Sequence, residues 1–234
     1  MFLEFLLNFQ QKVIFMKKYL DILKKCPLFA NVCEEDIVPL LSCLGARTEF
    51  FDKRYTVFAE GSPAKYIGIV LSGGVQMERV DYMGNRSIVL SAEPSELFCE
   101  AFACSQVQSI PVSVVAVKES EIMFIDCARI MYSCDHSCSF HRQMIFNLMK
   151  NLAEKNVLFH HKVDITSKRT TREKLLTYLD IQAKKFSSRE FSIPFDRQQL
   201  ADYLEVDRSG LSAEIGKLKK EGILDSEKNR FVLL

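Results

Sequence analysis

The chain has 234 residues, of which 48% are hydrophobic and 26% are charged, and its formal net charge is +1. These values fit a globular protein with a substantial core, and they exclude a disordered chain or a polybasic nucleic-acid coat. Eight cysteines occur without a secretory signal pattern. We therefore expect a cytoplasmic protein with free or metal-bound thiols and no disulfide framework.

The N-terminal part of the chain predicts short helices followed by an antiparallel β-roll. Residues 1–15 form an apolar extension that is too short to span a bilayer, and we expect no membrane association. Amphipathic helices are expected at Tyr19–Lys25 and Glu34–Cys43. From about Arg47, short apolar runs alternate with turns rich in Gly, Ser, Pro and Asp, which is typical of a small antiparallel barrel or roll. The expected strands are Tyr55–Ala59, Tyr66–Leu71, Val75–Val80, Arg86–Ala92, Val112–Lys118 and Glu121–Ile125.

A long helical pattern runs from about Asp135 to His161. Within it, apolar residues lie near heptad a/d spacing, which favours a dimerising helix pair; they are Ile145, Leu148, Leu152 and Phe159. Packing of this single helix on its own β-roll stays open as an alternative.

The C-terminal part predicts a winged helix-turn-helix. A capping box at Thr170–Glu173 opens a helix that extends to about Ala183, and a short strand is expected at Glu190–Pro194. Asp196 and Gln199 then predict the start of the next helix. Further on, Asp207 is expected to cap a second helix that buries Leu211, Ile215 and Leu218 and stops before Gly222. Two short apolar segments near the C-terminus, Ile223-Leu224 and Phe231–Leu234, are expected to pair as a β-hairpin wing.

This order of elements resembles the Crp/Fnr superfamily of bacterial regulators related to the cyclic-AMP receptor protein. The resemblance covers roughly Met16 to Leu234, and its most specific carriers are Tyr66–Val75 and Leu200–Leu224. It implies a transcriptional regulator that binds a palindromic operator in double-stranded DNA as a homodimer, with RNA polymerase as a further partner. The two recognition helices would enter successive major grooves about one DNA turn apart.

Carried over by position, the resemblance assigns DNA contacts to the second helix of the motif. Arg208 would read a guanine edge, with Ser209 and Ser212 beside it. The family often has another Arg where this chain has Ala213, so we expect fewer base contacts on that side. The expected phosphate contacts are Lys217, Arg169, Lys228 and Arg230. A protein-interaction module that has lost DNA binding stays open as an alternative, consistent with Ala213.

The effector pocket of the roll is expected near Cys99, Glu100 and Phe102. Cyclic-nucleotide-binding relatives use a Gly-Glu pair followed by an Arg that neutralises the phosphate. Here Cys99-Glu100 matches the pair in part, but no Lys or Arg occurs between Arg86 and Lys118. Because a buried phosphate needs a counter-charge, we expect an effector other than a cyclic nucleotide. The sequence identifies neither this effector nor a cofactor.

A second sensory hypothesis concerns Cys134, Cys138 and His141, which lie at i, i+4 and i+7 on one helical face. Such a set suits a soft metal, an iron–sulfur cluster, haem or a redox pair. The alternative is that these are buried structural residues, since free Cys is a common small apolar side chain. The four histidines show no catalytic spacing and we find no nucleophile elbow or phosphate loop, so we do not expect an enzyme.

Taken together, the patterns predict an α+β protein with an antiparallel, jelly-roll-like β-roll, a long central dimerisation helix and a winged helix-turn-helix. The predicted divisions are an N-terminal extension at 1–15, a β-roll with N-terminal helices at 16–133, the central helix at 134–162 and the DNA-binding domain at 163–234.

Overall fold

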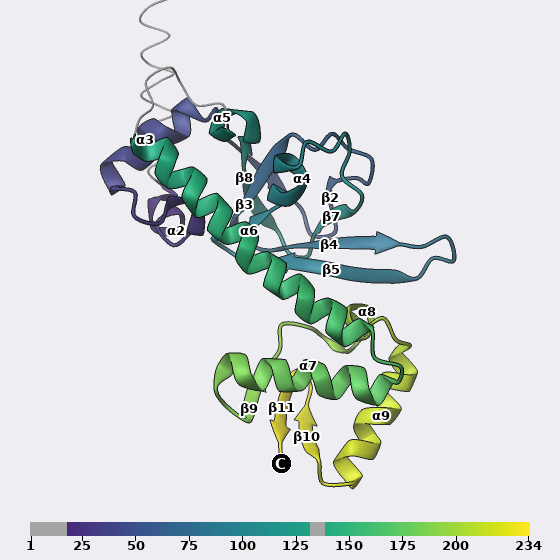
Figure 1. Cartoon of the computed structure of the whole chain (residues 1–234). Coiled ribbons are helices and arrows are strands. Elements are labelled where there is room, and N and C mark those ends of the chain that lie inside the picture. The colour runs from purple at the N-terminus through teal and green to yellow at the C-terminus, as the bar shows by residue number, and fades with distance from the viewer. Residues whose placement is uncertain (1–17, 132–138) are drawn as a thin grey trace, which may run out of the picture. The chain divides into compact units, whose positions relative to one another are not determined.

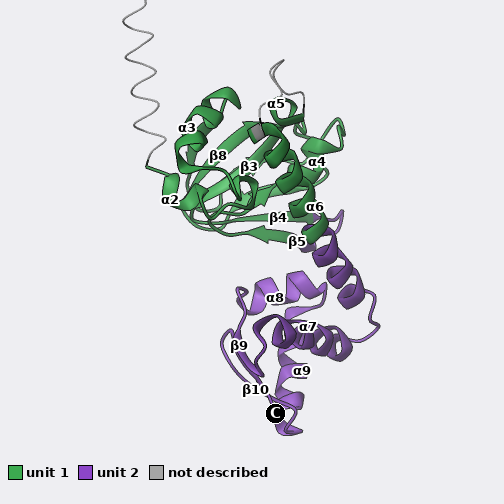
Figure 2. Ribbon diagram, turned by 60° about the vertical axis from the view of Figure 1, so that its left-hand side comes forward, with its two compact units in different colours: residues 1–79, 90–154 green, residues 80–89, 155–234 purple. Residues whose placement is uncertain are grey.

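A computed structural model describes residues 18–131 and 139–234 of the chain. The fold is α+β, as predicted. Contacts divide it into two compact units, one formed by 1–79 with 90–154 and the other by 80–89 with 155–234 (Figure 2). No described helix is long and apolar enough to cross a membrane.

The first unit is built on two four-stranded antiparallel sheets (Figure 1). One sheet has the order β1-β8-β3-β6 and the other β2-β7-β4-β5. The strands of the first sheet are β1 (Arg47–Phe51), β8 (Ser120–Asp126), β3 (Tyr66–Ser72) and β6 (Leu97–Phe98). Those of the second are β2 (Thr56–Phe58), β7 (Ser113–Ala116), β4 (Val75–Val80) and β5 (Arg86–Ala92).

Short helices flank these sheets. They are α2 (Leu20–Leu23), a 3-10 turn (Pro27–Phe29), α3 (Glu34–Cys43), α4 (Glu100–Cys104) and α5 (Cys127–Met131). The predicted helix at Glu34–Cys43 and the strands at Val75–Val80 and Arg86–Ala92 are confirmed to the residue. Sequence patterns missed β1, β6, α4 and α5. Strand β6 has two residues and the other three elements have five each, which are too few to show a period.

The turn between β3 and β4 explains the glycines of the Tyr66–Val75 signature. Gly73 has φ +81°, and a side chain there would meet the backbone of Glu119. Gly68, in the middle of β3, lies against the buried ring of Phe98, so that a Cβ would overlap the ring. Both positions therefore require glycine, one for conformation and one for space.

The core of the first unit includes one face of α6 (Ser139–Thr166). Met144 and Leu148 are buried with residues of α2 and α3, and the side-chain amide of buried Asn147 donates hydrogen bonds of 2.9 and 2.7 Å to the carbonyls of Leu28 and Ala30. Leu148 therefore faces the core of its own unit. Its predicted place on an exposed dimer seam is wrong.

The second unit holds a three-stranded antiparallel sheet of order β10-β11-β9, the C-terminal part of α6 from residue 155, and three further helices. The elements are α7 (Thr171–Phe186), β9 (Glu190–Ser192), α8 (Arg197–Leu204), α9 (Arg208–Lys220), β10 (Leu224–Glu227) and β11 (Arg230–Leu233). The core of this unit combines leucines of the three helices with Tyr178, Phe191 and Phe231. Helix α6 continues to Thr166, four residues beyond the predicted helix end at 162, and the predicted division between the central helix and the DNA-binding domain stays a prediction.

Candidate nucleic-acid interface

Helix α8 begins and ends as its sequence predicts. The backbone N–H of Gln199 donates to the carboxylate of Asp196 at 2.8 Å, and the backbone N–H of Asp196 donates to the Gln199 side chain at 2.9 Å, which completes the capping box. Glu205 ends the helix with φ 55° and ψ 56°, a left-handed conformation that glycine adopts more easily. The corner before α9 is therefore strained, as expected from Glu205 at a position where related motifs often have Gly.

Helix α9 presents one polar face and buries the other. The carboxylate of Asp207 accepts from the backbone N–H of Gly210 at 2.8 Å and from the hydroxyl of Ser209. These donors lower the pKa of Asp207 below its ordinary value. The predicted apolar face is confirmed, with Leu211, Ile215 and Leu218 buried.

The residues predicted to read bases lie at the exposed start of α9. Arg208, Ser209 and Ser212 are all exposed, within the first two turns of the helix. Ser209 differs from the other two because its hydroxyl already donates to Asp207. Within this set, Arg208 offers the free guanidinium fork suited to a base edge.

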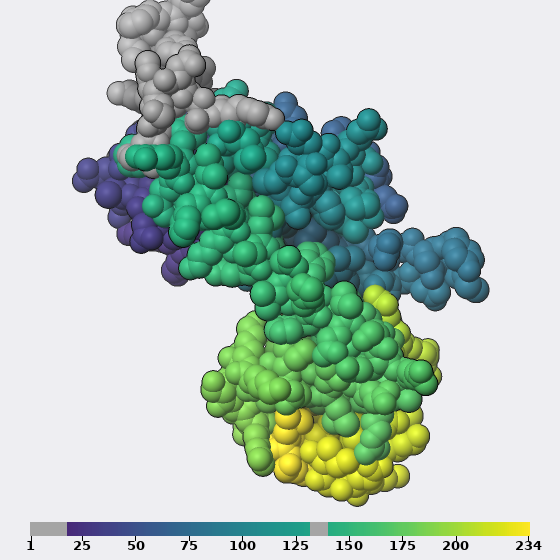
Figure 3. Space-filling model, in the orientation of Figure 1, coloured from purple at the N-terminus to yellow at the C-terminus, as the bar shows by residue number. Residues whose placement is uncertain are grey.

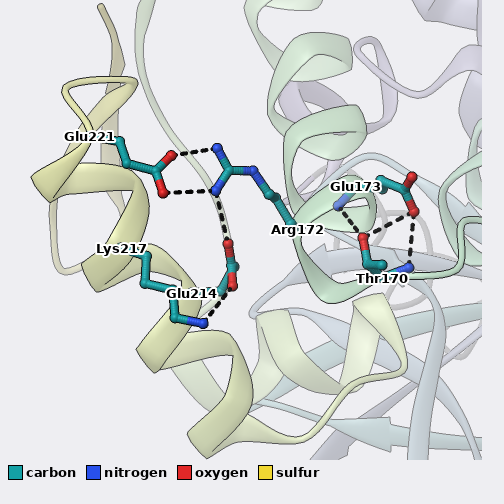
Figure 4. A network of polar contacts seen from close by, with 6 residues as sticks. All are labelled: Thr170, Arg172, Glu173, Glu214, Lys217 and Glu221. Atoms are coloured by element: carbon teal, nitrogen blue, oxygen red, sulfur yellow. Dashed lines mark hydrogen bonds and ion pairs between the residues drawn. The ribbon is translucent and has the colours of Figure 1, made fainter.

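An arginine on α7 links that helix to α9 (Figure 4). Arg172 donates to the Glu221 carboxylate at 3.1 and 2.5 Å and to Glu214 at 3.4 Å. Lys217 lies 3.6 Å from the other oxygen of Glu214. The Arg172 cation lowers the pKa of Glu221, and the hydrogen bond to Glu221 raises the pKa of Arg172. The network fixes α9 against α7 and neutralises two carboxylates that would otherwise repel phosphate.

The start of α7 is itself fixed by a capping box. The hydroxyl of Thr170 accepts from the backbone N–H of Glu173 at 3.2 Å, and the Glu173 carboxylate accepts from the backbone N–H of Thr170 at 3.0 Å. These contacts also lower the pKa of Glu173. The prediction of this box from Thr170 and Glu173 is confirmed. It places Arg172 in the first turn of α7, where its side chain faces α9 (Figure 4).

A buried lysine supports the end of α8. The ammonium of Lys162 donates to the carbonyl of Tyr203, lies 4.2 Å from the centre of the Tyr203 ring and 3.6 Å from a carboxylate oxygen of Glu205. Lys162 is 9% exposed. Burial lowers its pKa to about 8, and Glu205 opposes that shift. Sequence reasoning missed this site, because a lysine at the predicted helix end looks like an ordinary solvated residue.

The predicted phosphate contacts fall into two groups. Arg169 is exposed just before α7, Lys217 is exposed on α9, and Lys228 is exposed in the turn between β10 and β11. Arg230 instead pairs with Glu190 across the sheet, at 2.9 and 2.7 Å. Lys217 also lies near a carboxylate, at 3.6 Å from Glu214, but the two hydrogen bonds of Arg230 to Glu190 are shorter, which makes Arg230 the weakest of the four candidates.

The predicted effector residues lie together in the first unit. Cys99 and Glu100 are each 2% exposed at the start of α4, and Phe102 is half-buried in that helix. Cys99 has φ 61°, which explains why a Gly-Glu pair suits this turn in related proteins. Whether these residues contact an effector stays a prediction.

The proposed cysteine–histidine site is described only in part. Cys134 and Cys138 lie outside the described residues, and His141 is buried on α6. Among residues 18–131 and 139–234, no group of three His, Cys, Asp or Glu side chains is placed to hold a metal ion. None of the six cysteines in these ranges is in a disulfide bond.

Comparison with known families matches both units. A cyclic nucleotide-binding domain model matches residues 48–134, and a Crp-like helix-turn-helix domain model matches residues 173–234. The pairing of these two domains defines a DNA-binding transcriptional regulator. The chain belongs to the Crp/Fnr family.

Two curated relatives support this assignment. The chain is 20% identical to the transcriptional activator protein anr of Pseudomonas aeruginosa, over 73% of this chain and 70% of that protein. It is 23% identical to the transcriptional activator protein FnrA of Stutzerimonas stutzeri, over 86% and 81% of the two chains.

Solved structures show the same fold. The regulator CLP of Xanthomonas campestris matches with a TM-score of 0.69 and 17% identity, over 86% of this chain and 99% of that chain. FixK2 of Bradyrhizobium japonicum matches with a TM-score of 0.60 and 19% identity, over 80% and 92%.

Proposed function

We propose that this protein is a cytoplasmic homodimer that binds a palindromic operator through α9 and recruits or excludes RNA polymerase. Its effector is a molecule other than a cyclic nucleotide. The observation that carries the proposal is the exposed polar face of α9, with Arg208 at its first position and a compensated carboxylate pair behind it.

Arg208 is suited to the reading of a base edge. It is exposed at the N-terminal end of α9, the end that enters the major groove in helix-turn-helix proteins. Helix α9 carries Lys217, Lys219 and Lys220 against the single carboxylate of Glu214, which Arg172 and Lys217 both contact, so the net charge of the helix is positive although Lys219 also pairs with Asp225. Arg208 would supply sequence discrimination and the lysines, with Arg169 and Lys228, would supply attraction to phosphate.

The homodimer is proposed from the uncovered face of α6, part of which lies at the surface in Figure 3. Ile145, Met149 and Val163 are 39%, 60% and 63% exposed. With half-buried Leu152 and Phe159 they are separated by four, three, seven and four positions, which is compatible with a coiled-coil seam that skips one position near Lys155. Met149 takes the seam position that the sequence assigned to Leu148. A second copy of α6 would cover these apolar side chains.

The exclusion of a cyclic nucleotide rests on charge. Residues 87–117, which include α4 and its approach, contain no Lys or Arg. Ile110, at the position where relatives have Arg, is buried and apolar. A phosphate in this pocket would lack a counter-ion, at a cost that hydrogen bonds from Cys or Ser cannot offset.

Selection of duplexes from a random library by the purified full-length protein tests the proposal. We expect enrichment of an inverted repeat whose half-sites lie about 10 base pairs apart, centre to centre, because a two-fold dimer presents two recognition helices about one turn apart. Binding of the selected duplex should weaken steeply as salt rises. Failure to enrich any sequence, or enrichment of a single half-site bound by a monomer, would contradict it.

A further inference from the structure

Two cysteines far apart in the sequence lie side by side in the first unit. The sulfur of Cys104, at the end of α4, is 3.4 Å from the sulfur of Cys127, at the start of α5. Cys104 is half-buried and Cys127 is 3% exposed. A disulfide requires a sulfur separation of about 2 Å, which small rotations of both side chains can supply.

The pair is accessible to small molecules. A pocket of about 280 Å³ borders both cysteines, and its wall also includes Lys65, Ala103 and Gln106. Lys65 and Asp126 form an ion pair of 3.3 Å beside Cys127. An opening of this size, lined by apolar residues together with Lys65, Gln106 and Asp126, admits an oxidant as small as hydrogen peroxide while the protein remains folded.

The two thiols are chemically unequal. The hydrogen bond between them lowers the pKa of Cys104 and, together with burial, raises the pKa of Cys127. The geometry points the same way, because Cys104 is the less buried of the two residues and borders the pocket, so an oxidant reaches it more easily than Cys127. Cys104 is therefore the nucleophile of the pair, since the thiolate is the reactive form.

We propose that Cys104 and Cys127 are a redox-active dithiol that a peroxide converts reversibly to a disulfide. The Cys104 thiolate attacks one oxygen of hydrogen peroxide, the O–O bond breaks, and a sulfenic acid and hydroxide form. The Cys127 sulfur then attacks the Cys104 sulfur; the S–S bond forms, the S–O bond breaks, and the departing hydroxide takes the Cys127 proton as water. The hydroxide of the first step takes the proton that Cys104 released on ionising, so in total two thiols lose two electrons and two protons, and one peroxide becomes two waters.

The disulfide would tie α4 to α5. Helix α4 also carries Glu100, one of the predicted effector residues, so oxidation would restrict the movement of the helix that holds Glu100. This inference is independent of the proposed operator binding, because it concerns only the chemistry of the first unit.

Peptide mapping of the full-length protein tests the pairing directly. The protein is treated with hydrogen peroxide, alkylated without reduction, and cleaved after Lys and Arg and then after Glu. Cleavage at Glu100 separates Cys104 from Cys99, and cleavage at Arg129 separates Cys127 from Cys134 and Cys138. Each cysteine of interest is then on its own peptide.

We expect a linked Cys104–Cys127 peptide pair that dithiothreitol separates. Cys104→Ser should abolish the link, whereas Cys127→Ser should leave a sulfenic acid on Cys104 that dimedone traps. Cys43→Ser, which changes an exposed thiol elsewhere in the unit, should leave the link unchanged. Oxidation of exposed Cys43 shows that the peroxide has acted. If Cys104 and Cys127 are then both recovered as alkylated thiols, the proposal is overturned. Linkage of Cys104 to Cys99, Cys134 or Cys138 would overturn it equally.

Discussion

The buried ammonium of Lys162 makes the stability of the second unit depend on pH in a defined direction. In the folded protein burial lowers the pKa of Lys162 to about 8, while the unfolded chain keeps the ordinary value of 10.5. Between these values the unfolded state holds more protons, so the free energy of unfolding should rise with pH. Each pH unit contributes about 1.4 kcal/mol, which gives on the order of 3 kcal/mol over the window.

Substitution of Lys162 by Met isolates this contribution. Methionine fills a similar volume without a charge, so the variant should lack the rise between pH 8 and 10.5 that Lys162 produces. The measurement is urea unfolding of wild type and variant across that window, with the difference between the two curves as the readout. Tyr178, whose pKa burial raises, affects both curves alike. Parallel curves would refute the assignment of a desolvated cation to Lys162.

Three further substitutions test packing, capping and association. Gly68→Ala should lower the free energy of unfolding by about 1–3 kcal/mol, because the new methyl overlaps the Phe98 ring, and Phe98→Leu should restore part of it. Asp196→Ala should lower the free energy of unfolding by about 1 kcal/mol through loss of the α8 cap, whereas its control, exposed Asp180→Ala, should change it by only about 0.3 kcal/mol. Urea unfolding measures these two variants and the two at Gly68 and Phe98. Met149→Lys should convert a dimer to a monomer in native mass spectrometry, and an unchanged dimer would exclude α6 as the interface.

Local signals in the sequence predicted the caps and turns of the DNA-binding region. The boxes at Thr170–Glu173 and Asp196–Gln199 involve residues three positions apart, and the stop at Gly222 needs only a residue that tolerates φ 71°. The helix-turn-helix was predictable for the same reason, since its period, caps and corner are all contained in one continuous stretch.

Contacts between distant segments were not predictable in this way. Leu148 and Met149 are neighbours in the sequence, and only the packing of α6 on α2 and α3 decides that Leu148 is buried and Met149 exposed. The pairing of Arg172 with Glu221 depends on how α7 and α9 pack. Likewise, Cys104 and Cys127 meet because α4 and α5 pack together, which no spacing along the chain indicates.

The most direct test of DNA recognition by α9 is the affinity of Arg208→Ala for the selected duplex. We expect a loss of about 1–3 kcal/mol per half-site and relaxed preference at one base pair in each half-site, because a bidentate contact to guanine is removed. Lys184→Ala, which removes an exposed cation paired with Asp180 on α7, serves as the matched control and should bind like wild type. Unchanged affinity and unchanged base preference in Arg208→Ala would contradict the proposed role of α9.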